Sequence, residues 1–294
     1  MKQITLAKKV DGVGVGLHKG EPIHFSMEPL DANSGIVFYR SDTNTYIEAT
    51  PKNVIDTQMA TVIGKDGQSV STIEHILSAI SAYGIDNILI KIDALEAPVM
   101  DGSSASFCMM FNEANLAQQE ANKKIMVIKK EVEVREGNKF AKISPNPDTA
   151  FTFSIDFDHP SIGFQKFHLN FSKQNYIDQI SRARTFGFLK DFQMLRSRNL
   201  ALGASLDNAV VMDEKKVINS DGLRFSNEFV RHKILDAIGD LSLLGMSYLG
   251  HYESFAGSHD LNHKLTLEIL KDPQNYTITD LQNVKDTTFA KAFA

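Results

Sequence analysis

Residues 230–240 constrain the fold most, because they predict an amphipathic helix with a chemically rich polar face. His232, Asp236 and Asp240 are each four residues apart, so on a helix they form one slowly rotating stripe. A solvated face is the common explanation for such a stripe. The alternative is a metal site, because a His and an Asp one turn apart suit zinc. The apolar positions recur on the opposite side: Val230, Ile234, Ala237, Ile238, Leu241 and Leu244.

Residues 71–80 predict the start of a second helix, whose apolar face leaves His75 pointing away from the core. Ser71 and Glu74 have the spacing of a capping box, which would explain Glu74 without any chemistry. That explanation leaves His75 unassigned. A functional interpretation makes His75 a third metal ligand and Glu74 a base beside it. Three protein ligands and one open position are the arrangement of a catalytic zinc ion, not of a structural one.

The composition is that of a globular protein, with 43% hydrophobic and 23% charged residues. The 294 residues suffice for one large or two medium domains. A net charge of −5 argues against a general nucleic-acid binder. With Cys108 as the single cysteine, a metal site must use His and carboxylate ligands. No signal peptide or bilayer-spanning apolar run is present, so we expect a cytoplasmic protein, and attachment to a membrane surface stays open.

The order of the predicted elements favours strands plus helices in each half, and hence two α+β layers. Residues 12–18 are glycine-rich and predict a bent strand or bulge rather than a phosphate loop. The polar stretch 118–124 is the best linker candidate, and the residues from about Lys271 onward are expected to fray. Further elements are predicted at 88–92 (buried strand), 98–103 (turn into a helix), 125–134 and 150–157 (strands), 200–212 (short helix and strand) and from about Ser226 (long helix).

Six motifs, taken in order, resemble the zinc-dependent UDP-3-O-acyl-N-acetylglucosamine deacetylase family of lipid A biosynthesis. The resemblance runs from the first residues to about Leu270 and implies an α+β fold of two facing α/β-sandwich domains. Each domain would carry a small insert, with the active site in the cleft between them. The implied domains are residues 1–120 and 125–270, with an acyl-passage insert at about 190–215 and a tail at 271–294. The motifs are Gly14–His18, Thr72–His75, Met100–Ser103, Ala183–Phe188, Val230–Asp240 and Ser258–His259.

The resemblance also implies roles at the reacting centre. One catalytic Zn²⁺ would be bound by His75, His232 and Asp236, and Glu74 would be the general base that activates the attacking water. His259 would be the cation that steadies the oxyanion or protonates the leaving amine. Two further residues would assist: Asp240 by orienting His259, and Thr185 by stabilising the oxyanion with its hydroxyl. Without the resemblance, Thr185 suits a buried strand equally well, and His259 would be a surface-loop histidine.

Substrate-binding residues follow from the same resemblance. Asp156 and Phe157 match the position that contacts uracil, and Lys139 and Lys233 match lysines near the diphosphate. Each has an ordinary alternative, since strand aromatics pack in cores and lysines are usually solvated. Departures from the family pattern at Asn199, Ala204, Gln58 and Met59 affect the expected shape of the acyl passage, not the zinc chemistry. The passage residues would be Leu200, Ala201, Leu206 and Val211, which could also form the insert's own core.

The implied activity is hydrolysis of the N-acetyl group of UDP-3-O-acyl-N-acetylglucosamine. It releases acetate and leaves a free 2-amine, as the committed step of lipid A biosynthesis. This small molecule would be the partner, with no nucleic acid, and the protein would be a cytoplasmic monomer with transient contact to the inner membrane surface. One alternative is a zinc amidase for another acylated or acetylated sugar, which would lose the nucleotide site at Asp156 and Phe157. Another is a metal-free nucleotide-sugar or acyl-lipid binding protein, which would not need Glu74, His75, His232 and Asp236 together.

Overall fold

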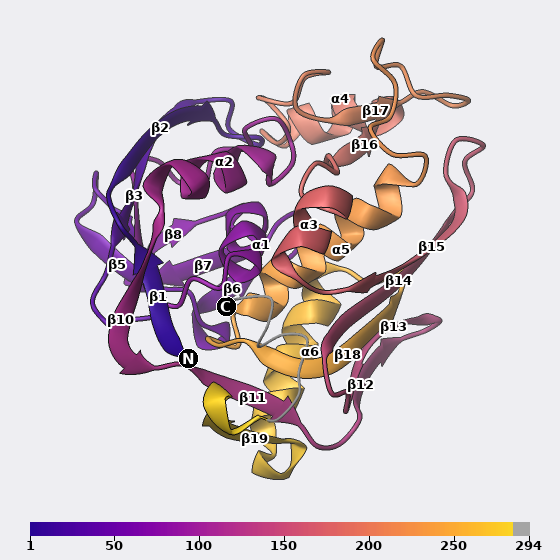
Figure 1. Cartoon of the computed structure of the whole chain (residues 1–294). Coiled ribbons are helices and arrows are strands. Elements are labelled where there is room, and N and C mark those ends of the chain that lie inside the picture. Colours follow the sequence, from indigo (N-terminus) through magenta and orange to yellow (C-terminus); the bar gives the residue numbers. More distant parts are fainter. Residues whose placement is uncertain (285–294) are drawn as a thin grey trace.

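The computed structural model describes residues 1–284. Two helices lie in its middle, α1 (Glu74–Ala82) and α5 (Glu228–Ser242), with one sheet on each side (Figure 1). The sheet at the left of Figure 1 is built from the N-terminal half, and the sheet at the right from the C-terminal half. The molecule is therefore layered as sheet, helices, helices and sheet, which confirms the predicted α+β fold of two facing sandwiches.

The main N-terminal sheet has the strand order β2-β3-β9-β4-β5. Its residues alternate between buried and partly exposed positions, as in β9 (Ile88–Ile92), because one face packs on helices. The predicted buried strand at 88–92 is confirmed. The other strands of this half are β1 (Lys2–Leu6), β2 (Val10–Val15), β3 (Pro22–Pro29), β4 (Ile36–Arg40), β5 (Thr45–Glu48), β6 (Val54–Asp56), β7 (Val62–Lys65), β8 (Gln68–Val70) and β10 (Leu116–Asn122).

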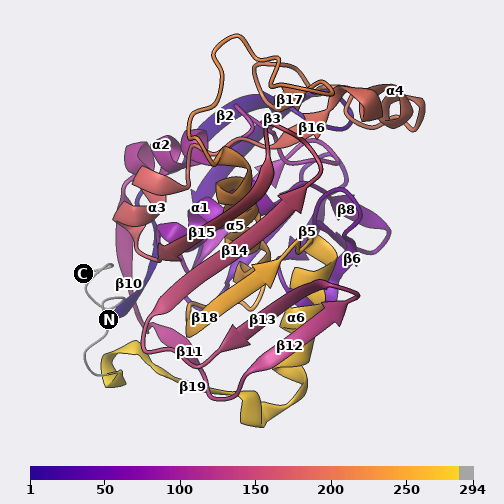
Figure 2. The same cartoon turned by 90° about the vertical axis from the view of Figure 1, so that its right-hand side faces the viewer.

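The C-terminal sheet is organised around β18 (Tyr248–Phe255), which pairs antiparallel with β13 and parallel with β11 and β14. Figure 2 shows this sheet face-on. β14 continues antiparallel into β15, and β11 is flanked by β19. The strands are β11 (Lys124–Ile128), β12 (Val132–Glu136), β13 (Lys139–Ser144), β14 (Thr149–Phe157), β15 (Gly163–Asn170) and β19 (Tyr276–Asp280).

An insert above the two layers is formed by β16 (Phe186–Phe188), α4 (Leu189–Ser197) and β17 (Val210–Met212) (Figure 1). The two strands pair in parallel, and α4 has no buried residue. The predicted short helix thus lies before residue 200, not after it. The remaining helices and 3-10 turns are α2 (Ala105–Ala114), α3 (Lys173–Gln179), α6 (His259–Lys271), η1 (Pro51–Asn53), η2 (Pro273–Asn275) and η3 (Leu281–Asn283).

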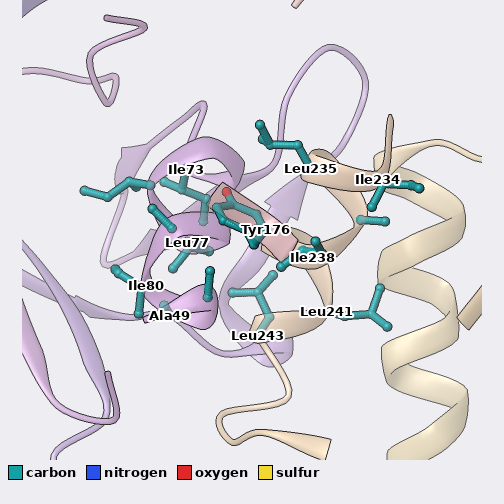
Figure 3. Close-up of a cluster of buried hydrophobic side chains, with 14 of the residues drawn as sticks. Ala49, Ile73, Leu77, Ile80, Tyr176, Ile234, Leu235, Ile238, Leu241 and Leu243 are labelled. Carbon is teal, nitrogen blue, oxygen red and sulfur yellow. The ribbon is translucent and has the colours of Figure 1, made fainter. Parts of the chain in front are cut away.

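The contact between α1 and α5 brings the two halves together. Figure 3 shows Leu77 and Ile80 of α1 in the same buried cluster as Ile238 of α5, with Tyr176 of α3 beside them. Gly239 allows the close approach, because a Cβ atom added there would lie 2.0 Å from the carbonyl oxygen of Glu74. Any larger residue would have to push the helices apart, since protein interiors have little free space.

Three sequence predictions were wrong. The polar stretch 118–124 is not a linker: its first part belongs to β10, which pairs with β1, and Lys123 is buried. Gln119 takes part in a hydrogen-bond network with Asn87, so these polar side chains are satisfied inside the fold.

The segment after Lys271 does not fray as far as it is described, because β19 pairs along its whole length with β11. The rest of that tail, 285–294, lies outside the described residues. The capping box is also absent, since the residue that caps α1 is Ile73, without a side-chain bond.

Two smaller expectations can also be compared with the structure. Asn199 has a positive φ of 56°, so asparagine takes over a conformation that usually favours glycine. Ala204 does not have a positive φ and so needs no glycine, although Ala201 does, with φ of 54°. No helix within residues 1–284 is both long and apolar enough to cross a bilayer.

Candidate active site in the cleft

The structure brings His75, His232 and Asp236 together at the N-terminal half of the α1–α5 contact. One ligand atom from each residue lies within 4.8 Å of the others. Asp236 Oδ1 is 3.2 Å from His232 Nε2 and 3.7 Å from His75 Nε2. All three residues are buried, as is Asp240, so the solvated-face explanation of the stripe is wrong.

Burial also sets the protonation states of these three groups. Burial, together with the neighbouring His232, lowers the pKa of His75 to about 3. It also lowers the pKa of His232, against the opposing pull of Asp236. Burial disfavours the charged form of Asp236, but His232 and Lys233 outweigh it and hold the pKa of this carboxyl far below its usual range. At neutral pH the cluster therefore consists of two neutral imidazoles and one carboxylate, the forms that bind metal.

Among the described residues, the hydrogen bonds around the cluster leave two buried side-chain atoms without a partner, one carboxylate oxygen and one imidazole nitrogen. His232 Nδ1 lies 3.0 Å from the carbonyl oxygen of Ala183, which orients the ring and leaves Nε2 toward Asp236. Lys233 Nζ donates to Asp236 Oδ2 at 2.8 Å. Within residues 1–284, neither Asp236 Oδ1 nor His75 Nδ1 has a hydrogen-bond partner, although both are buried. A buried, unpaired carboxylate oxygen is costly, and a bound cation would remove that cost.

Glu74 and His259 lie next to this cluster, and both have shifted pKa values. Burial raises the pKa of Glu74 to about 7, with help from Asp240 and Asp236 and against the attraction of His259. Burial lowers the pKa of His259, but the carboxylates of Asp240 and Glu74 outweigh it and raise that pKa to about 9. His259 Nε2 lies 3.9 Å from Glu74 Oε1, and its Nδ1 lies 2.9 Å from Asp240 Oδ2. A carboxyl and an imidazole with these pKa values can share base and acid work.

A cavity of about 670 Å³ opens in front of these groups and is lined by residues of both halves. Thr185 lies on its wall, half-buried and directly before β16. Its backbone is fixed, because its N–H donates to the carbonyl oxygen of Gly102 and its own carbonyl accepts from Val210 N–H. Gln58 and Met59 reach the same cavity from the N-terminal half.

Most predicted substrate residues line this cavity. Phe157 is half-buried, and its ring contacts the rings of Phe186 and Phe188. Asp156 and Lys139 lie on the same wall. Of the predicted passage residues, Ala201, Leu206 and Val211 line the cavity, whereas Leu200 does not.

Several lining residues were missed by sequence reasoning. Phe192 and Leu195 lie on the inner side of α4, and their spacing of three was the signal that could have found them. Ile218 follows β17 in an irregular segment that carries no periodicity. Two further residues, Thr61 and Asn262, were missed although they do not line the cavity: they bond the carboxylates beside His259. They are single polar residues far apart in the sequence, and no local pattern marks them.

Comparisons with known proteins identify the family of this chain. Residues 3–271 match the family model described as LpxC, UDP-3-O-acyl N-acetylglycosamine deacetylase. A protein of Campylobacter fetus named UDP-3-O-acyl-N-acetylglucosamine deacetylase is 61% identical over 294 residues, which is all of both chains. Proteins with the same name from Campylobacter jejuni and Sulfurimonas denitrificans are each 60% identical, again over the full length of both chains. On both grounds, this chain belongs to the LpxC family of deacetylases.

Proposed function

We propose that this protein hydrolyses the N-acetyl group of UDP-3-O-acyl-N-acetylglucosamine. The products are acetate and the free 2-amine, and the reaction is the committed step of lipid A biosynthesis. The observation that carries the proposal is the meeting of three buried metal-binding side chains with Glu74 and His259 in the lining of one largely apolar cavity. Family membership supplies the substrate class.

We assign the metal as zinc, held by His75, His232 and Asp236. Two imidazoles and one carboxylate form a typical ligand set for a catalytic zinc ion. The unpartnered Asp236 Oδ1 and the neutral state of both histidines support this fit. Zinc bound there supplies Lewis acidity toward the amide carbonyl and makes water nucleophilic near neutral pH.

Glu74 is the general base in this proposal. Its pKa near 7 lets it accept a proton from the attacking water and release it again without a large free-energy barrier. His259 remains protonated at that pH, so it donates a hydrogen bond to the oxygen that becomes negative and then passes a proton to the leaving nitrogen. Asp240 holds the ring of His259 through Nδ1.

Thr185 and Lys233 have supporting roles at the reacting carbonyl. Thr185 is placed by backbone bonds on the cavity wall, and its hydroxyl is suited to donate to the developing oxyanion. Lys233 keeps its charge, because Asp236 raises its pKa against the effect of burial. It steadies the Asp236 carboxylate and adds positive potential for a phosphate group.

We further assign other residues of the cavity lining to substrate recognition. Phe157, with Asp156, binds the uracil ring, and Lys139 lies near the diphosphate. Ala201, Leu206 and Val211, with Phe192 and Leu195, form the apolar passage for the acyl chain. Leu200 is left out of the passage, because it does not reach the cavity. Gln58 and Met59 line the same cavity from the N-terminal half.

We also propose that residues 1–120 and 125–270 act as two domains, with the insert at about 190–215. In support, β11–β15, β18 and β19 form one sheet without a strand from the first half, as far as residues 1–284 are described. We expect a cytoplasmic monomer that contacts the inner membrane surface transiently. Light scattering tests whether the protein is a monomer, and fractionation of cells tests its location and its contact with the membrane.

The decisive experiment is a deacetylation assay on UDP-3-O-acyl-N-acetylglucosamine, with and without a chelator. We expect about one zinc ion per chain, loss of activity on chelation and recovery on addition of zinc. Full activity of metal-free protein would contradict the metal assignment. Equal turnover of an acylated N-acetyl sugar that lacks the nucleotide would instead favour a general sugar amidase.

A further inference from the structure

The carboxylates on either side of His259 share one neighbour, Thr61. This residue directly precedes β7 and is only 1% exposed. Its backbone N–H donates to Glu74 Oε2 at 3.1 Å, and its hydroxyl donates to Asp240 Oδ1 at 2.6 Å. One residue therefore holds both the proposed base and the partner of the proposed acid.

Each of the two carboxylates has its second oxygen toward His259. Asp240 Oδ2 is 2.9 Å from Nδ1, and Glu74 Oε1 is 3.9 Å from Nε2. Asp240 Oδ2 also accepts from Asn262 Nδ2 at 2.8 Å, and Asn262 Oδ1 accepts from the hydroxyl of Tyr252 at 2.6 Å. The orientation of the Asp240 carboxylate is thus determined by three donors, of which only the Thr61 hydroxyl acts on Oδ1.

We propose that Thr61 is a positioning residue for the deacetylation: its hydroxyl fixes the Asp240 carboxylate and, through it, the ring of His259. This inference rests on the proposed function. Without the hydroxyl, Oδ1 is a buried acceptor with no donor, and the carboxylate gains the freedom to rotate away from His259. Glu74 would stay in place, because its bond comes from the backbone of Thr61, which every substitution except proline preserves.

The alternative is that Thr61 is merely a buried polar residue whose hydroxyl bond stabilises the fold. Loss of one such bond costs about 1–3 kcal/mol in either case, so thermal stability alone does not separate the two explanations. The separation has to come from catalysis and from the state of His259. Thr61→Val is the sharpest variant, because it keeps the shape and the backbone donor and removes only the hydroxyl.

In the experiment, wild type, Thr61→Val and Thr61→Ser are compared for zinc content, Tm, kcat and KM. We expect Thr61→Val to keep its zinc and its KM and to lose about 10–100-fold in kcat, the usual scale for residues that orient groups around a metal site. Thr61→Ser restores the hydroxyl and should recover most of kcat. If Thr61→Val does not fold, Thr61→Cys takes its place and should show a partial loss, because a thiol is a weak donor.

Thr5→Val is the matched control. Thr5 is a buried threonine of β1, remote from the cleft; its hydroxyl donates to the Asn87 carbonyl at 2.6 Å and accepts from Leu30 N–H at 3.1 Å. This variant should lose at least as much stability as Thr61→Val, and its kcat should be unchanged. A second readout is the imidazole ¹H–¹⁵N NMR spectrum of metal-free protein, in which the His259 signals should move in Thr61→Val and stay in Thr61→Ser and Thr5→Val.

A double-mutant cycle closes the test. With Asp240→Asn already present, Thr61→Val should cost little more, because both changes act through the same carboxylate. Wild-type kcat in Thr61→Val, an equal loss of kcat in Thr5→Val, or unmoved His259 signals would each overturn the proposal. Failure of the proposed function looks different, because the wild type itself would then leave the acetyl group in place.

Discussion

Gly239→Ala is a change for which the structure predicts a large effect from a single methyl group. Gly239 is the only glycine in the helices α1 to α6 of the described residues. In most helices, alanine in place of glycine is favourable by about 0.5–1 kcal/mol. Here the added Cβ would lie 2.0 Å from the carbonyl oxygen of Glu74, 2.8 Å from its carbonyl carbon and 3.0 Å from its Cα.

The steric effect should exceed the helix preference. Ordinary contact begins at 3.4 Å, so the backbones of α1 and α5 must separate by about 1.4 Å at this level. Overpacking of this kind costs about 1–3 kcal/mol. After subtraction of the helix preference, we expect a loss of up to about 2 kcal/mol and a Tm lower by several degrees. The separation also exceeds the roughly 0.2 Å that a metal site tolerates, so His75 would be displaced from His232 and Asp236.

The assay is thermal unfolding together with zinc affinity, measured by competition with a chelator. We expect both Tm and zinc affinity to fall in Gly239→Ala. The control is Gly187→Ala, since a Cβ at Gly187 meets nothing within 4 Å and its φ is not positive. A Gly239→Ala protein that is more stable than wild type and binds zinc as tightly would refute the argument, because helix preference would then have prevailed.

Four further results are expected. Glu74→Gln should lose roughly 10²-fold or more in kcat, on the scale of general-base catalysis, and keep its zinc; near-normal kcat would remove Glu74 from the chemistry. The pH–rate profile should be bell-shaped: activity falls as Glu74 is protonated below about 7 and as His259 loses its proton above about 9. A bound cation favours ionised Glu74 and moves the acid limb lower, and a flat profile between pH 5 and 10 would count against both roles. Substrates differing only in acyl length should lose kcat/KM as the chain shortens, since each buried CH₂ contributes about 0.8 kcal/mol, whereas indifference to length would remove the insert from recognition. Glu228→Gln should lower Tm sharply, because it leaves Arg184, whose Nε is 2.9 Å from Glu228, with a weakened partner in the core; an unchanged Tm would show that the pair adds no stability.

Sequence periodicity was a sound guide to the central elements. The stripe in 230–240 and the apolar face in 71–80 correctly predicted helices, and the four-residue spacing correctly placed His232 and Asp236 on one side of α5. The burial of that side could not be predicted, because a polar stripe looks the same whether it faces water or a second helix. Only the α1 contact, made possible at Gly239, decides between the two.

The errors come from polar residues that are satisfied by distant partners. Residues 118–122 look like a linker, yet their strand pairs with residues near the N-terminus, and Lys123 is buried beside Asp86. No sequence pattern indicates the role of Thr61 either, because the atoms that it bonds belong to residues 13 and 179 positions away. Long-range hydrogen bonds of this kind leave no local pattern.

The reactive centre lies at the contact between α1 and α5, so binding of a cation there is coupled to the packing of the two halves. Glu74 and His75 come from one helix, whereas His232 and Asp236 come from the other. A cation that binds only the assembled centre therefore stabilises the packing of α1 against α5 by mass action. The effect is reciprocal, since any change that weakens the packing of α1 against α5 must also weaken the binding of the cation. Cation binding at the centre and packing of α1 against α5 are therefore thermodynamically linked, so a change in one should be measurable in the other.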